Sequence, residues 1–177
     1  MNGYFMTTER LGFSLWREDD IGKATELWGN PKVTKFITAK GNITEEEVKQ
    51  RLKKEIETFE NSEIQYWPIY LLETKEFVGC CGLRPYDLSI NILEMGIHLK
   101  EKYWGLGLAE EACNAVMNYA FKTIKVSSLF AGHNPNNKAS EKLLKKLGFK
   151  YTHDEFYQPT GLNHPSYLMS KNDFKFI

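Results

Sequence analysis

The chain has 177 residues, and 42% of them are hydrophobic and 14% aromatic, so it can bury a core of its own and is not disordered. Lys and Arg number 23 and so do Asp and Glu, which leaves no net basic charge to drive nucleic-acid binding. No apolar run approaches the ~20 residues of a membrane span, and residues 1–9 lack the pattern of a signal peptide. We therefore expect one cytoplasmic domain over residues 1–177 that binds neither nucleic acid nor a membrane.

Apolar spacing and capping residues predict a strand and two helices in the first third of the chain. Residues 13–16 have the pattern of a strand, and Asp19 begins a helix that ends before Pro31. A second helix begins at Thr44, where Glu47 stands at the capping-box spacing. The apolar residues that follow recur at steps of four, four and three, which places them on one helical face; they are Val48, Leu52, Ile56 and Phe59.

The rest of the chain alternates between predicted strands and helices. The predicted strands cover residues 66–72, 77–83, 90–99, 128–133, 150–156 and 165–169. One helix begins at Gly107, and another covers residues 137–147 and ends at Gly148, as a C-terminal glycine cap would end it. This order of elements predicts a mixed α/β fold built of layers.

The turn between the strand of residues 90–99 and the next helix contains two glycines, Gly105 and Gly107. Glycines at this spacing let the backbone turn closely and point successive N–H groups into one concavity. The helix that follows adds unpaired N–H donors and the positive end of its dipole, which suits a phosphate or pyrophosphate. A tight turn without a ligand also explains the spacing. The turn lacks the Gly-Lys-Ser/Thr of a P-loop, and Glu110 stands where a dinucleotide fingerprint needs a small residue.

Residues 102–107, Lys-Tyr-Trp-Gly-Leu-Gly, resemble the acetyl-CoA signature of the GNAT N-acetyltransferases, Arg/Gln-x-x-Gly-x-Gly/Ala, with Lys102 as a departure. The extension of this pattern through Ala112 resembles the branch that contains the RimJ and RimL ribosomal-protein acetyltransferases. Three further segments match that branch in the same order: residues 9–11 with 15–20, residues 94–99, and residues 135–140 with 146–149. The resemblance implies a mostly antiparallel central sheet flanked by helices, acetyl-CoA as acyl donor and a primary amine as acceptor.

This resemblance also implies which residues bind the cofactor. The pyrophosphate loop consists of Lys102, Tyr103, Trp104, Gly105, Leu106, Gly107, Leu108 and Ala109. The pantetheine arm pairs with the backbone near Ile97 and Leu99, where the family's strand parts from its neighbour. The residues themselves show no such parting, and both also suit an ordinary core. Asn137 contacts the cofactor by the resemblance, although an asparagine there also serves as a helix cap. A solvated surface lysine explains Lys102 equally well.

Glu94 is the candidate general base, since a free amine arrives protonated and a carboxylate or a water chain must accept its proton. Glu94 lies in an apolar strand and at the position of the family's Glu-x-Gly pattern. A carboxylate in such a strand is costly unless it has a partner. The alternative is a structural Glu94 that faces solvent or pairs with an arginine such as Arg84. His98 shares the same face of the strand, where a lone histidine is more often structural.

The proton donor to the leaving thiolate is harder to assign. Many GNAT relatives place a tyrosine four residues before the Gly-Phe that ends the last helix, and this chain has Leu144 there. Ser140 is the nearest hydroxyl within the motif, and water is the other candidate. Further hydroxyls without an assigned place are those of Tyr151, Tyr157 and Tyr167.

Three cysteines, Cys80, Cys81 and Cys113, are expected to be reduced and largely buried, because their number is odd and two stand in an apolar strand. No Cys/His cluster has zinc spacing, so no metal site is predicted. No histidine has motif spacing to Cys113, which favours direct attack of the amine over a covalent cysteine route.

The predicted activity is therefore transfer of an acetyl group from acetyl-CoA to a primary amine, either a protein N-terminus or a small molecule. One alternative is a catalytically idle acyl-CoA-binding or regulatory module. Another is a polyamine or aminoglycoside acetyltransferase, whose acidic cleft would come from the glutamates of residues 45–47 and 55–60, although such runs are usually solvated. The acceptor amine is not readable from the sequence, and an oligomer is possible.

Overall fold

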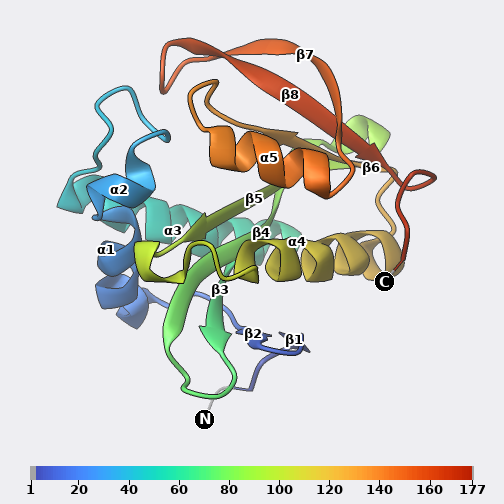
Figure 1. Ribbon diagram of the computed structural model, residues 1–177. Coiled ribbons are helices and arrows are strands. Elements are labelled where there is room, and N and C mark those ends of the chain that lie inside the picture. The colour runs from blue at the N-terminus through green and yellow to red at the C-terminus, as the bar shows by residue number, and fades with distance from the viewer. Residues whose placement is uncertain (1–2, 177) are drawn as a thin grey trace.

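A computed structural model describes residues 3–176 as one eight-stranded sheet with helices on both faces (Figure 1). The strands are β1 (Met6–Thr7), β2 (Leu11–Phe13), β3 (Tyr66–Leu71), β4 (Phe77–Asp87), β5 (Ile92–Leu99), β6 (Ser128–Gly132), β7 (Lys150–Tyr157) and β8 (Leu162–Ser170). The helices are α1 (Ile21–Trp28), α2 (Pro31–Thr34), α3 (Glu45–Ser62), α4 (Leu108–Tyr119) and α5 (Lys138–Lys146). Within residues 3–176, no helix combines the length and the apolar character needed to cross a bilayer.

The strand order is β1-β2-β3-β4-β5-β6-β8-β7. Among the described residues, β5 and β6 form the one parallel pair, and every other neighbouring pair is antiparallel. The prediction of a mixed, mostly antiparallel sheet flanked by helices is thus confirmed. So is the capping box of α3, where the Thr44 N–H donates to Glu47 Oε2 at 2.7 Å and the Glu47 N–H donates to Thr44 Oγ1 at 3.2 Å.

The predicted elements differ from the structure mainly near the N-terminus. The first long strand is Leu11–Phe13, not residues 13–16, because the Trp16 N–H donates to the Gln65 side chain at 2.9 Å and the chain leaves the sheet there. The two-residue strand β1 was not predicted, since its side chains carry no pattern. Nor was α2, which begins at Pro31, where the prediction had only a helix end.

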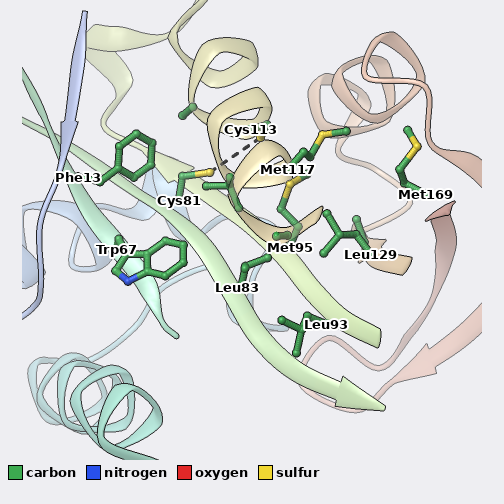
Figure 2. Packing of buried hydrophobic residues seen from close by; sticks show 14 of the residues in the cluster. Phe13, Trp67, Cys81, Leu83, Leu93, Met95, Cys113, Met117, Leu129 and Met169 are labelled. Atoms are coloured by element: carbon green, nitrogen blue, oxygen red, sulfur yellow. Dashed lines mark hydrogen bonds between the residues drawn. The ribbon is translucent and has the colours of Figure 1, made fainter. Parts of the chain in front are cut away.

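Two apolar cores lie on opposite faces of the sheet, the larger under α4 and the smaller under α1 and α3. Figure 2 shows Cys81, Met95 and Leu129, from three adjacent strands, gathered beside Cys113 and Met117 of α4. All three cysteines are free and buried, as predicted.

Alternation along β5 places its side chains on both of these faces. Leu93 and Met95 belong to the core under α4. Glu94 and His98 have the opposite parity, and His98 accepts a hydrogen bond from Trp28 of α1. Glu94 is therefore directed to the α1/α3 side of the sheet, beside the smaller core.

The β5–β6 pair is short. Its paired residues are Ile92, Leu93 and Glu94 of β5 with Ser128, Leu129 and Phe130 of β6. Beyond this point β6 continues to pair with β8, through Ala131 and Gly132, while β5 continues along β4. The two central strands therefore part after Glu94, which opens the sheet.

Candidate active site

A cavity of about 670 Å³ lies where β5 and β6 part. Its volume is in the range of small-molecule sites. Its wall includes the even-numbered face of β5, the glycine turn, the first turns of α4 and α5, and the ends of the β7–β8 hairpin. Segments that are far apart in the sequence therefore meet around one space.

The glycine turn has a backbone that only glycine adopts freely. Gly105 has φ 74° and Gly107 has φ 76°, both in the left-handed region. Gly107 is the N-cap residue of α4, and no side chain caps that helix end. The first N–H groups of α4 are therefore left for another acceptor, next to the cavity that Gly107, Leu108 and Ala109 line. An anion such as a pyrophosphate fits this arrangement.

Arg10 holds the outer side of the glycine turn in place. Its guanidinium donates to the Leu106 carbonyl at 2.9 Å, and its Nε donates to Glu111 Oε2 at 2.7 Å. The Glu111 side chain also accepts from the Thr8 hydroxyl at 2.5 Å and from the Arg10 N–H at 2.9 Å. Although burial raises the pKa of Glu111, the hydrogen bonds from Thr8 and Arg10 lower it overall. The N-terminal segment thus fixes the turn, a role that the spacing of the sequence did not reveal.

Most predicted loop residues line the cavity, and two do not. Those that do are Tyr103, Trp104, Gly105, Gly107, Leu108 and Ala109. Lys102 instead pairs with Glu76, its Nζ lying 2.9 Å from Oε1, and this hydrogen bond raises the pKa of Lys102. Leu106 is exposed on the outside of the turn. A pyrophosphate contact by Lys102 stays a prediction and would require exchange of its Glu76 partner.

The edge of β5 that faces the cavity carries backbone groups without a strand partner. The Lys100 N–H donates to the Val78 carbonyl at 2.9 Å, so the backbone groups of Leu99 point to the other side, away from β4. The Leu99 carbonyl accepts from Trp104 Nε1 at 2.9 Å. Ile97 has the same parity as Leu99 and, in the described chain, no strand pairs with that edge of β5 beyond Glu94. An extended amide chain is a suitable partner for Ile97.

Glu94 lines the cavity and accepts a hydrogen bond from Tyr66 of β3, whose hydroxyl donates to Oε1 at 3.0 Å. Burial and the Glu94 charge raise the pKa of Tyr66 well above its usual value, so the phenol stays a donor. A Cβ on Gly96 would lie 2.2 Å from the Tyr66 hydroxyl, so only glycine fits at that position. Arg84 pairs with Glu55 instead, so the alternative pairing of Glu94 with Arg84 is not found.

His98 has a structural setting within the same wall. Trp28 Nε1 donates to its Nδ1 at 3.2 Å, and Cys80 Sγ lies 3.8 Å from the same nitrogen. Burial, together with the charges of Arg51 and Arg84, lowers the pKa of His98 well below its usual value. The ring is therefore neutral and serves as an acceptor for Trp28.

The first turn of α5 brings Asn137 and Ser140 to the cavity. Asn137 Oδ1 accepts from the Ser140 N–H at 3.2 Å, which is the predicted cap. This bond leaves the Asn137 amide nitrogen without a protein partner among the described residues. Leu144, one turn later, is buried and lines the same wall. The cap and a cofactor contact are therefore compatible.

Of the three unassigned tyrosines, only Tyr157 lines the cavity. Tyr151 is exposed outside it, and the Tyr167 hydroxyl is buried 3.4 Å from His133 Nε2. Ser166 of β8 also lines the cavity, and its buried Oγ has no hydrogen-bond partner. Its strand was predicted to begin at residue 165, but the sequence carried no sign that this hydroxyl reaches the site.

Two aromatic side chains in the cavity wall stack on each other. The rings of Tyr86 on β4 and Phe130 on β6 stack with centroids 4.0 Å apart. The Tyr86 hydroxyl donates to Glu155 Oε2 of β7 at 3.3 Å. Sequence reasoning missed these three residues, because they lie on three separate strands that only the sheet order brings together.

A sequence model of the acetyltransferase (GNAT) domain matches residues 10–150, which is most of the chain. The protein belongs to the GNAT acetyltransferase family. An uncharacterized N-acetyltransferase of Bacillus licheniformis is 27% identical over 143 residues, which cover 81% of this chain and 80% of that protein. The family predicted from the motifs is thus confirmed. A ribosomal protein uS5-alanine N-acetyltransferase of Escherichia coli, 29% identical over 86 residues that cover 48% of this chain and 44% of that protein, is consistent with the predicted RimJ/RimL-like branch.

Solved GNAT structures share the fold. An acetyltransferase of this family from Bacillus anthracis has a TM-score of 0.80 at 23% identity, with 94% of this chain and 98% of that chain covered. RimL, a ribosomal alpha-N-protein acetyltransferase in complex with coenzyme A, has a TM-score of 0.77 at 12% identity, with 94% and 97% covered. A spermidine N-acetyltransferase from Vibrio cholerae, in complex with CoA and spermine, has a TM-score of 0.77 at 14% identity, with 94% and 98% covered.

Proposed function

We propose that this GNAT enzyme acetylates a primary amine by direct attack within the cavity, with acetyl-CoA as donor. One observation carries the proposal: the uncapped N-terminus of α4 and the carboxylate of Glu94 open into the same space. Acetyl-CoA supplies the activated acetyl group. The α4 end and the glycine turn would hold its pyrophosphate, the free edge of β5 at Ile97 its pantetheine arm, and Asn137 a polar group of the same molecule.

Glu94 would accept the proton that the ammonium group of the acceptor must lose before it attacks. Its Tyr66 hydrogen bond orients the carboxylate and leaves Oε2 for the amine. A cysteine route is disfavoured because Cys113 is buried, with its Sγ 4.0 Å from that of Cys81, and burial raises the pKa of the Cys81 thiol well above its usual value. Three free thiols also support a reducing cytoplasm as the location.

The test is release of free thiol from acetyl-CoA with a panel of peptides, polyamines, aminoglycosides and amino acids. We expect release with at least one class of amine at a rate well above that of hydrolysis alone. Binding of acetyl-CoA without release for any amine would contradict the proposal and favour the idle acyl-CoA-binding module.

We expect Ser140→Ala to lower turnover by roughly tenfold or less, because water near α5 shares the delivery of a proton to the leaving thiolate. Leu144→Tyr, if the ring is accommodated, should keep or raise the rate, since residues 140 and 144 share one face of α5. Steady-state kinetics with each variant measures both effects. Abolished turnover in Ser140→Ala with unchanged acetyl-CoA affinity would instead identify Ser140 as the acid.

A further inference from the structure

Arg51 of α3 lines the cavity as a cation without an anionic partner. No carboxylate lies within 4.0 Å of its nitrogens among residues 3–176, and its buried Nε has no hydrogen-bond partner. Its guanidinium carbon lies 5.3 Å from the centroid of the Trp28 ring. A half-buried cation with a buried, unpaired Nε is costly unless something else pairs with it.

The natural partner of Arg51 is already engaged. Glu55 stands one helical turn further along α3, at the spacing at which an arginine and a glutamate usually pair. Instead, Glu55 Oε1 pairs with Arg84, and Oε2 accepts the Tyr66 N–H at 2.9 Å. The Arg84 guanidinium also lies over the Tyr66 ring, 3.9 Å from the centroid. Arg84 thus takes up the Glu55 carboxylate, although its own Nε has no hydrogen-bond partner, and no carboxylate of residues 3–176 is left to pair with Arg51.

Arg51 and Glu94 therefore carry opposite charges on one cavity wall, and neither has an ion-pair partner among residues 3–176. Arg51 lies over the Trp28 ring, and Trp28 donates a hydrogen bond to His98, which places Arg51 near the His98 end of β5. Glu94 lies four residues earlier on the same face of β5. Strand geometry places the Cα atoms of residues 94 and 98 about 13 Å apart. The side chains of Arg51 and Glu94 reach toward each other and shorten the distance between the two charges. This wall matches a molecule with an ammonium group at one end and an anionic group at the other.

We propose that the acceptor is a small amine that also carries a carboxylate, and that Arg51 binds this carboxylate while Glu94 receives the amine. The inference rests on the proposed acetyl transfer and names its substrate class. Arg51 binds the carboxylate by charge-assisted hydrogen bonds, for which a guanidinium has the matching fork. A polyamine has no group for Arg51 and would bring a further positive charge toward it.

The experiment compares matched amines that differ only by the carboxylate: 4-aminobutanoate with propylamine, and L-phenylalanine with phenethylamine. For the wild type we expect kcat/KM to favour the carboxylated member of at least one pair by about tenfold to a hundredfold. Arg51→Gln should remove this preference by raising KM for the carboxylated amine. Arg51→Lys should keep part of it, since lysine retains the charge without the fork.

Lys32→Gln is the matched control. Lys32 also borders the cavity and loses one positive charge on substitution, but it is exposed and pairs with Glu101, its Nζ lying 2.7 Å from Oε1. The preference for the carboxylated amine should survive in this variant. Thermal melting checks the fold of Arg51→Gln, whose melting temperature should match or exceed that of the wild type because a half-buried charge without an ion-pair partner is removed.

Equal kcat/KM for both members of each pair, or an unchanged preference in Arg51→Gln, would overturn the proposal. If no amine is acetylated, the proposed function fails, and calorimetry of 4-aminobutanoate and propylamine with the CoA-loaded protein then tests Arg51 separately. Tighter binding of 4-aminobutanoate that Arg51→Gln abolishes would support the carboxylate site, and equal binding of the two would reject it.

Discussion

Glu94→Gln should lower turnover by ~10²-fold or more with little change in acetyl-CoA affinity. The amide cannot accept the proton of the ammonium group, yet its oxygen can still accept the hydrogen bond that the Tyr66 hydroxyl donates at 3.0 Å. The loss should therefore fall on kcat and leave the fold intact. The pH profile of wild-type turnover should have an acidic limb that is absent from the variant. Steady-state rates across pH, with calorimetry of acetyl-CoA binding, measure both effects.

Glu155→Gln is the matched control for this experiment. Glu155 lines the same cavity as Glu94 and likewise accepts a hydrogen bond from a tyrosine hydroxyl, that of Tyr86 at 3.3 Å. We expect this variant to keep the wild-type pH profile of kcat. A Glu94→Gln enzyme that retains both its rate and its acidic limb would assign Glu94 to structure. A selective loss in Glu155→Gln would move the base to β7.

Gly107→Val should weaken acetyl-CoA binding by about 3 kcal/mol, on the order of a hundredfold in Kd, in a folded protein. Gly107 caps α4 with φ 76°, and a branched side chain there strains the left-handed backbone and displaces the N–H groups that would meet the pyrophosphate. An added Cβ meets only an Arg10 nitrogen at 3.5 Å, an ordinary contact, so crowding alone does not predict unfolding. Titration calorimetry with acetyl-CoA measures the loss.

Gly161→Val controls for backbone strain. Gly161 has φ 69° in the turn between β7 and β8, with open space around its Cβ position, and it does not line the cavity. This variant should lose a similar amount of stability through strain and keep its acetyl-CoA affinity. If Gly107→Val fails to fold, Gly107→Ala provides the same comparison with less strain. Unchanged affinity in a folded Gly107 variant would rule out the pyrophosphate site at this turn.

Local signals in the sequence were sufficient to predict most of the helices and strands. The capping box of Thr44, the glycine end of α5 at Gly148 and the alternation along β5 each depend on neighbours within a few residues, so they were readable before the fold was known. The prediction was wrong where a contact distant in the sequence sets the end of an element. The strand β2 ends early because the side chain of Gln65 accepts a hydrogen bond from the Trp16 backbone, 49 residues away. The strand β1 exists only because β2 pairs with it.

The sequence by itself determined the family, the mostly antiparallel sheet, the buried free cysteines and the glycine turn that opens α4, because contiguous motifs encode them. Only the tertiary structure decided what faces the cavity. In the structure, Glu94 accepts a hydrogen bond from Tyr66 of β3 and does not pair with Arg84. Lys102 pairs with Glu76, and Arg51 has no carboxylate partner among residues 3–176. The physical reason is that pairing and burial depend on which strands and helices lie side by side, and that arrangement is set by the packing of the whole chain.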